Sequence, residues 1–169
     1  IHVELAPSIT VDLRELGRVR MAKSGGELAT LVQYYRGDLL GDAGELGPEL
    51  AHWRQAERAR IEQQFAAQAS EAALRIGGRD ALVALDDLAT RMPLSEEVCR
   101  AQLQLLLRDG NITGARALLE SFASRMVHEL GIGPAPETVA LLEPPAVDRP
   151  TATIHRLSEV RDRIEPTAP

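Results

Sequence analysis

The longest regular pattern of apolar positions in this chain runs from Pro48 to Ile76. Apolar residues recur there at steps of three and four, the spacing that lines one face of an α-helix. They are Leu50, Trp53, Ile61, Phe65, Ala69, Ala72 and Ile76. Proline is favoured at the first position of a helix and glycine just past its end. Pro48 and the pair Gly77-Gly78 therefore predict one long helix, with Trp53 in the core.

The same periodicity predicts shorter helices on both sides of this segment. They span about residues 12–22, 27–35, 79–91, 96–109, 112–130 and 136–142. Asp12 and Glu15 form a capping-box-like start for the first of them. Gly25-Gly26 is expected to interrupt helical structure between the first two of these helices. Ser95 is expected to cap the helix that begins at residue 96, and Gly110 to stop it.

The second half of the chain nearly repeats itself every 34 residues. When residues 75–92 are aligned with 109–126, Ala81 falls on Ala115. The other matches are Leu85 with Leu119, Ala89 with Ala123, and Arg91-Met92 with Arg125-Met126. A period of 34 residues is typical of the tetratricopeptide helix–turn–helix repeat, in which a small residue lets two helices approach closely. The expected fold is therefore an all-α, tetratricopeptide-like bundle of helical hairpins.

The two ends of the chain differ from this pattern. Residues 1–11 alternate apolar and polar positions around Pro7-Ser8, which predicts a short β-hairpin or a junction to an upstream domain. Residues 143–150 contain three prolines and are interpreted as a linker. Residues 154–164 form a short amphipathic stretch, either a helix leading into a further domain or a disordered tail. The predicted organisation is therefore 1–11, 12–142 for the helical domain, and 143–169 for the linker and tail.

Composition narrows the class of protein. The formal net charge is −6, which argues against duplex DNA binding by this chain alone, because phosphate neutralisation needs a basic surface. A local basic cluster consists of Arg14, Arg18 and Arg20 with Lys23, and it is interpreted as a phosphate contact or as a solvated helix face. The single cysteine fits a reducing cytoplasm, and no apolar run reaches the roughly 18 residues of a membrane span. Because the chain begins with Ile1, we interpret it as a piece of a longer polypeptide or a processed chain.

The residues that could carry chemistry do not form a recognisable site. The sequence contains no phosphate-binding glycine loop and no His-Glu-x-x-His motif, and its four histidines have no ligand-like spacing. Asp86 and Asp87 are adjacent, so on a helix they point about 100° apart and make a poor acid–base pair. Cys99, Met92 and Met126 are expected to fill the core. The prediction is a protein that is not an enzyme, with no metal site and no cofactor.

A repeat of this kind predicts a surface that holds a partner. In stacked helical repeats the first helices of successive pairs line the concave side. Polar residues without an evident core role fall on that side, and they are the candidate partner-binding residues Gln63, Ser70, Glu97, Arg100 and Gln104. We expect Arg100 and Gln104 to contact a protein segment. The alternative is that these side chains are simply solvated.

Three landmarks, in order along the chain, resemble one family. The segment Tyr34-Tyr35-Arg36-Gly37-Asp38-Leu39-Leu40 is similar to the Y-x-G-x-L-L opening of the bacterial transcriptional activator domain. Trp53 with Glu57-Arg58 resembles the W-x-x-x-E-R start of its first long helix. The segment from Glu129 to Thr138, read as E-L-G-I-G-P-A-P-E-T, is very similar to its closing E-L-G-V-x-P-S-P-E-T signature. The resemblance covers about residues 11–142.

The resemblance implies a transcription regulator of the antibiotic-regulatory-protein type, in which this domain follows a winged-helix DNA-binding domain. It implies partners that are proteins, namely the regulator's own DNA-binding domain, RNA polymerase or a second copy, and DNA only through the missing domain. The glycine-rich loop at 41–47 and the small residues near Ala69–Ala73 depart from the family pattern. The alternative is a tetratricopeptide-type peptide-binding scaffold unrelated to transcription.

Overall fold

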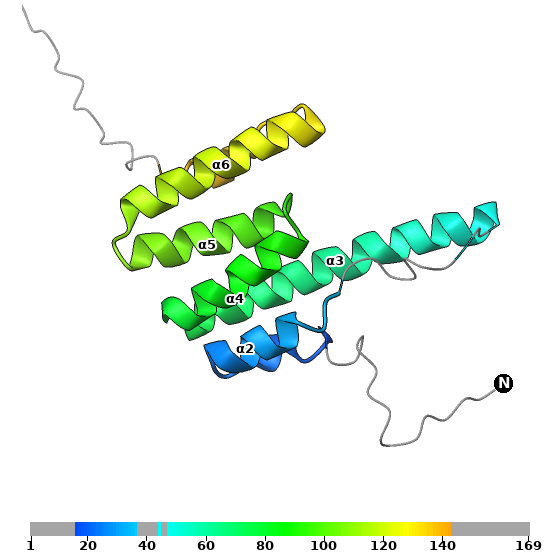
Figure 1. Cartoon of the computed structure of the whole chain (residues 1–169), viewed down its shortest axis with the longest axis horizontal. Coiled ribbons are helices and arrows are strands. Elements are labelled where there is room, and N and C mark those ends of the chain that lie inside the picture. The colour runs from blue at the N-terminus through cyan, green and yellow to red at the C-terminus, as the bar shows by residue number, and fades with distance from the viewer. Residues whose placement is uncertain (1–15, 37–43, 45–46, 143–169) are drawn as a thin grey trace, which may run out of the picture.

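A computed structural model of the chain describes residues 16–36, 44 and 47–142. Throughout this part of the chain the regular elements are helical (Figure 1). They are η1 (Val19–Met21, a 3-10 turn), α2 (Gly25–Val32), α3 (Pro48–Ile76), α4 (Gly78–Arg91), α5 (Glu96–Arg108), α6 (Ile112–Leu130) and α7 (Pro136–Val139). The β-hairpin expected at residues 1–11, the Asp12–Glu15 capping box, and the linker and tail at 143–169 lie outside the described residues.

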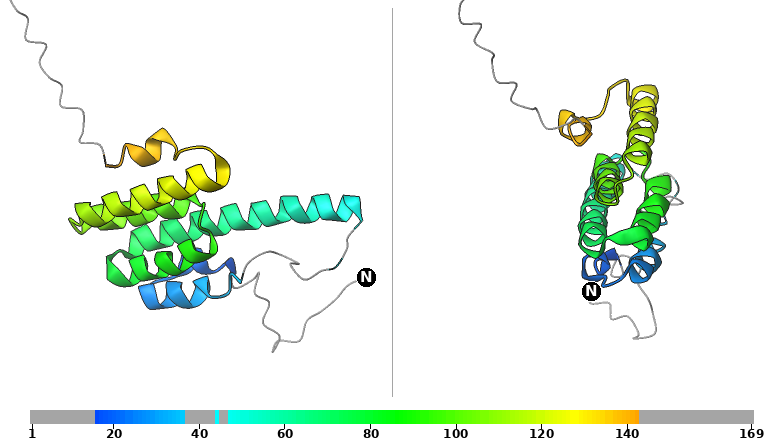
Figure 2. Two further views of the ribbon diagram at one scale, coloured as in Figure 1. Left: turned by 45° about the horizontal axis from the view of Figure 1, so that its top comes forward. Right: turned by 90° about the vertical axis from the view of Figure 1, so that its left-hand side faces the viewer.

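The helices stack as pairs, as the 34-residue period predicts. One row joins the first helices of successive pairs, with α3 packed against η1 on one side and α5 on the other. The second helix α4 packs against α2, and α6 packs against α5 (Figure 2). The short helix α7 contacts α5, where the first helix of a further pair would lie. The all-α prediction is confirmed for the described residues.

Two hydrophobic clusters hold the stack together. The larger lies around α2, α3 and α4, where the ring of Tyr35 stacks on Phe65 with centroids 5.3 Å apart. The smaller lies between α5 and α6 and contains Cys99, Leu103, Ala115, Phe122 and Met126. Helix α5 contributes to both, because its Val98, Ala101 and Leu105 belong to the larger cluster. Ala81 and Ala115, which occupy matching repeat positions, are both fully buried.

Local signals explain the helix boundaries that the sequence predicted well. The Ser95 hydroxyl accepts a hydrogen bond from the Val98 amide, which caps α5. Gly77 and Gly131 end α3 and α6 with φ of 71°, a conformation that glycine adopts without the clash that a Cβ would create. The predicted spans of α3 and α6 are confirmed.

The structure differs from the prediction at the glycine pair that opens α2. Gly25 and Gly26 are not an interruption between two helices. They form the first two positions of α2, which Ser24 caps. Gly25 is buried where α2 approaches α4, and a Cβ there would lie 2.3 Å from the Cβ of Asp80. Glycine is needed at this point for close packing. Met21, in the preceding turn η1, is 62% exposed.

The N-terminal half of α3 extends beyond its neighbours (Figure 1). No residue between 48 and 60 is buried among the described part of the chain, and burial on this helix begins near Phe65. Leu50 and Trp53 are 47% and 50% exposed, so the prediction that Trp53 belongs to the core is wrong. The apolar stripe correctly identified one face of the helix. It carried no information about whether another element covers that face.

Candidate partner-binding groove

A groove of about 380 Å³ lies where the middle of α3 faces the start of α5. Its lining residues are Ala59, Glu62, Gln63, Ala66, Ala67, Ser95, Glu96 and Glu97. Both helices are first helices of their pairs, so the groove lies on the side where a partner surface was expected. It brings together two of the predicted residues, Gln63 from α3 and Glu97 from α5.

The lining of the groove combines small apolar side chains with negative charge. Three alanines, Ala59, Ala66 and Ala67, leave room beside the backbone of α3. Glu62, Glu96 and Glu97 also line the groove, and the lining contains no lysine or arginine. Acidic residues in the first turn of α5 also stabilise that helix, because its N-terminus carries partial positive charge. The groove therefore presents an acidic edge above a small apolar floor.

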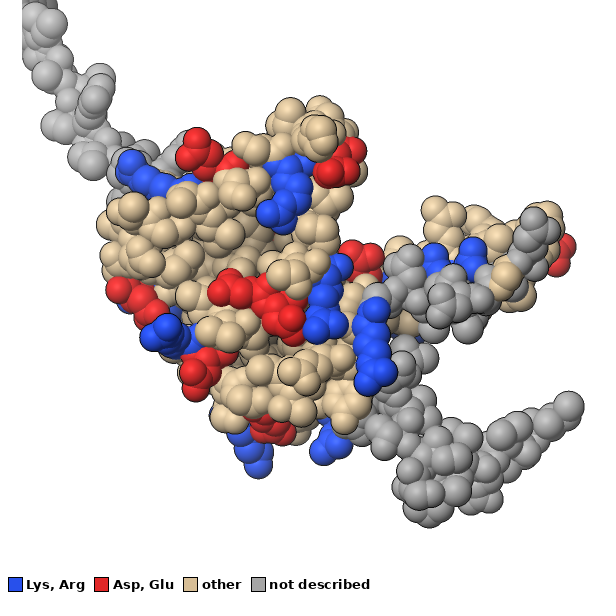
Figure 3. Space-filling model, in the orientation of Figure 1, with Lys and Arg blue, Asp and Glu red and all other residues tan. Residues whose placement is uncertain are grey.

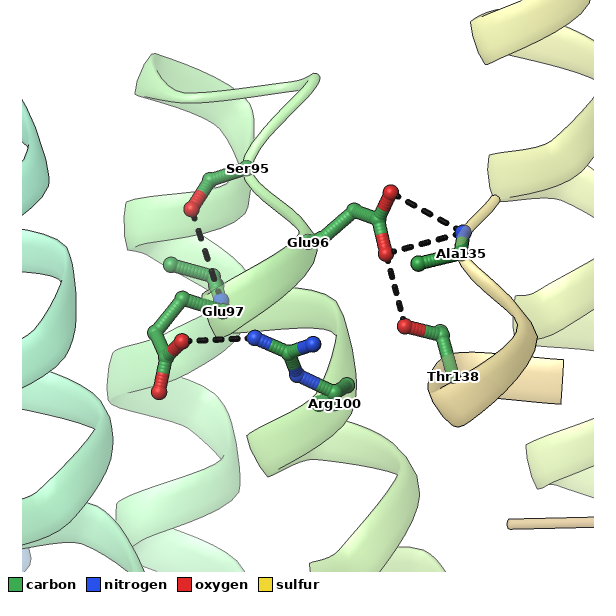
Figure 4. A network of polar contacts seen from close by, with 7 residues as sticks. Ser95, Glu96, Glu97, Arg100, Ala135 and Thr138 are labelled. Carbon is green, nitrogen blue, oxygen red and sulfur yellow. Dashed lines mark hydrogen bonds and ion pairs between the residues drawn. The ribbon is translucent and has the colours of Figure 1, made fainter. Parts of the chain in front are cut away.

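The two glutamates that begin α5 point to opposite sides (Figure 4). The Glu97 carboxylate accepts a hydrogen bond from Arg100 at 2.7 Å, and these side chains are 47% and 33% exposed. This ion pair offsets part of the negative charge of the groove. A pair this exposed contributes only about 0–1 kcal/mol to stability, so a partner could displace it at small cost.

Glu96 has a structural task that the sequence analysis did not identify. Its carboxylate accepts hydrogen bonds from the Ala135 amide at 3.1 Å and from the Thr138 hydroxyl at 2.7 Å. These bonds fasten the segment that follows α6 onto the start of α5 (Figure 4). Thr138 is fully buried. The only sequence signal for this contact was the threonine of the closing motif, which gives no indication of its partner forty-odd residues upstream.

The remaining predicted residues divide between surface and core. Gln104 is half-buried on α5, one turn beyond Arg100. Ser70 is 1% exposed, so its prediction as a partner-binding residue is wrong. Its hydroxyl has no hydrogen-bond partner among the described residues. A small polar residue near the C-terminal half of α3 looks available in the sequence, but α3 is packed on several sides in that half.

A second hollow of about 260 Å³ lies between the residues before η1 and α3. It is lined by Leu16, Gly17, Glu57, Arg60, Ile61, Gln64, Phe65 and Gln68. The Arg60 guanidinium donates hydrogen bonds to Glu57 and Gln64, and its contact lowers the pKa of the Glu57 carboxyl. The Arg60 and Glu57 side chains are partly exposed, so we interpret them as an ordinary surface ion pair.

The cysteine is buried rather than reactive. Cys99 is 2% exposed in the smaller cluster, and burial, with a further contribution from Glu96, raises the pKa of its thiol to about 12. The thiolate is the nucleophilic and metal-binding form, so this side chain is chemically inert near neutral pH. Within the described residues, no three His, Cys, Asp or Glu side chains are grouped closely enough to hold a metal. None of the helices described is both long and apolar enough to cross a membrane.

The closing signature now has a physical explanation. Gly131 takes the left-handed conformation that ends α6, and Thr138 is held by Glu96. Comparison with protein families gives one match, to the bacterial transcriptional activator domain, over residues 12–144. The chain belongs to this family. The activator domain is a regulatory domain of transcription regulators, as the resemblance implied. Comparison with curated proteins found no match, and comparison with solved structures found none.

Proposed function

We propose that this activator domain is the protein-interaction module of its transcription regulator. It positions or dimerises a DNA-binding domain and couples that domain to a protein partner. Membership of the family supports a role in transcription over an unrelated peptide-binding scaffold. The observation that carries the interaction role is the groove between α3 and α5, which lies on the expected face of the stack. The partner is the regulator's own DNA-binding domain, RNA polymerase or a second copy.

The working surface that we propose consists of Gln63, Glu97, Arg100 and Gln104. The first two line the groove, Arg100 pairs with Glu97, and Gln104 continues the same helix. DNA is contacted only by another domain of the regulator, in the bacterial cytoplasm. The net charge of −6 supports this division of labour. On the face shown in Figure 3, lysine and arginine are interspersed with aspartate and glutamate over the described residues, without a broad basic area.

Filling the groove in the full-length regulator tests this proposal. Ala67 is exposed and lines the groove, so Ala67→Trp should obstruct it without disturbing the core. The control is Ala117→Trp, at an exposed position on α6 away from the groove. We expect Ala67→Trp to reduce transcription from the target promoter, with DNA affinity and melting temperature unchanged. Normal transcription with Ala67→Trp would contradict the proposal.

A further inference from the structure

The acidic edge of the groove is not fully explained by the stability of the helices that form it. Glu96 and Glu97 lie in the first turn of α5, where negative charge is favoured by the helix dipole. Glu62 lies in the middle of α3, where the dipole gives no such advantage. Within the described residues, Glu62 has no hydrogen bond or ion pair. Its charge is therefore available to a group that enters the groove.

The floor of the groove is suited to a polypeptide. Ala59 and Ala66 are seven residues apart and therefore lie on one face of α3, and Ala67 lines the groove beside them. Side chains this small allow another chain to approach the α3 backbone closely. Gln63, between them, can donate and accept hydrogen bonds. A chain that carries small apolar residues between its charged ones would match both the floor and the edge.

From the charge and the shape together, we propose that the groove binds a basic segment of a protein partner, with Lys or Arg side chains against Glu62 and Glu97 and small residues over the alanines. This inference rests on the proposed function for the location of the surface, and it adds the chemistry of the partner. Phosphate-rich ligands are disfavoured here, because the Glu62 and Glu97 side chains line the groove and its lining contains no lysine or arginine.

The proposal predicts that loss of Arg100 and loss of a groove carboxylate have opposite effects on the affinity for a basic segment. The Arg100 guanidinium forms an ion pair with the Glu97 carboxylate at 2.7 Å, and it therefore competes with the Lys or Arg side chain of a partner. Removing this competitor should strengthen binding of a basic segment, whereas removing either carboxylate should weaken it. Damage to the fold would weaken binding in every case, so the contrast separates recognition from structural loss.

The test uses the whole 169-residue chain and a fluorescein-labelled peptide of repeated Ala-Ala-Arg triplets. A peptide with glutamate in place of each arginine is the matched probe control. We expect fluorescence anisotropy to show saturable binding of the basic peptide only, weakening as salt screens the charges. Glu62→Gln and Glu97→Gln should each weaken binding about two- to fivefold, and Arg100→Gln should tighten it about twofold.

The protein control is Glu71→Gln, an exposed glutamate of α3 that does not line the groove. It should leave the affinity unchanged. Failure of the basic peptide to bind, or binding that Glu62→Gln and Glu97→Gln leave unaltered, overturns the inference. If the peptide does not bind but Ala67→Trp still abolishes transcription, the groove works with a partner of different chemistry and only this inference fails. If the peptide binds as expected but Ala67→Trp transcribes normally, the inference stands and the proposed regulatory role fails.

Discussion

Arg91 and Arg125 stand one repeat apart and make the same contact. The Arg91 guanidinium donates a hydrogen bond to the carbonyl of Tyr35, just past the end of α2. The Arg125 guanidinium donates to the carbonyl of Pro93, just past the end of α4, and both distances are 3.0 Å. Each second helix is therefore fastened to the end of an earlier one. The repeat preserves a polar contact as well as an apolar spacing.

The first helices are connected in a similar way. Arg75, in the last turn of α3, donates to the carbonyls of Arg20 and Ala22 around the end of η1. Arg108, at the end of α5, donates to the carbonyl of Leu74 near the end of α3. The last carbonyls of a helix lack partners within it and carry partial negative charge, so a guanidinium is a suitable donor.

Loss of these contacts should destabilise the stack. We expect Arg91→Ala and Arg125→Ala each to lower the free energy of unfolding by about 1 kcal/mol, because a charge-assisted hydrogen bond to a carbonyl just past a helix end is lost. Urea unfolding of the purified chain measures the effect. Arg116→Ala, at an exposed position of α6, is the control and should leave stability nearly unchanged. Equal stability of all three variants and the wild type would contradict the role assigned to these arginines.

The two glycines that open α2 should respond oppositely to alanine. Gly25→Ala should cost about 1–3 kcal/mol, because the added Cβ would meet the Asp80 side chain and backbone. Gly26 has open space at the corresponding position, so Gly26→Ala should stay within about 0.5 kcal/mol of the wild type or be slightly more stable. Thermal unfolding of the pair measures the difference. A Gly25→Ala variant as stable as Gly26→Ala would rule out the close approach of α2 to α4.

Ser70 should be replaceable by alanine with a gain in stability. Its hydroxyl is buried without a partner among the described residues, and an unsatisfied buried polar group is unfavourable. Ser70→Ala should therefore stabilise the chain by about 1 kcal/mol, with no change in binding of the basic peptide. Denaturant unfolding and anisotropy give the two readouts. A loss of peptide affinity would return Ser70 to the partner surface.

The contacts of Glu96 should hold the closing segment in place. Glu96→Gln and Thr138→Val each remove hydrogen bonds from this joint, and each should cost about 1–3 kcal/mol locally. We expect faster amide hydrogen exchange in residues 131–142, with little change in α2 and α3. Glu137→Gln, exposed on α7, is the control. Unchanged exchange in the closing segment of both variants would show that these bonds do not hold it.

The buried thiol predicts a loss of stability at alkaline pH. Folding raises the pKa of Cys99 from an ordinary value of 9.0 to about 12, so above about pH 9 the unfolded chain releases this proton and the folded chain retains it. The unfolded state then binds fewer protons, and stability falls as pH rises through this window. Urea unfolding between about pH 8 and 11 should show a steeper decline for the wild type than for Cys99→Ala. Parallel declines would contradict the shifted pKa.

Helix positions were predictable because their signals are local. Pro48, Gly77 and Gly131 define the ends of α3 and α6 through backbone preferences that need no distant partner. Burial was less predictable, since it depends on what packs against a helix. Trp53 lies on an apolar stripe but is half exposed, whereas the polar Ser70 is buried.

The candidate site was also predictable where it depends on the repeat, but not where it depends on contacts between residues distant in the sequence. The repeat correctly indicated which helices face each other, and so placed Gln63 and Glu97 beside one groove. The link from Glu96 to Thr138 joins residues distant in sequence, and no periodic pattern encodes such a pair. The pairing of Arg100 with Glu97 follows from their spacing of three residues on one helix. That this pair lies beside a groove could not be predicted, because the opposite wall of the groove is formed by α3.

Helix α5 belongs to two cores at once, with Val98 and Leu105 in the larger and Cys99 and Leu103 in the smaller. The joint between successive repeats is therefore a shared helix and not a boundary between separable units. A chain shortened to end at Gly110 would expose to water the apolar face of α5 that α6 normally covers. We expect such a fragment to aggregate through this exposed apolar face. Removal of the C-terminal hairpin alone therefore does not leave a stable shorter stack.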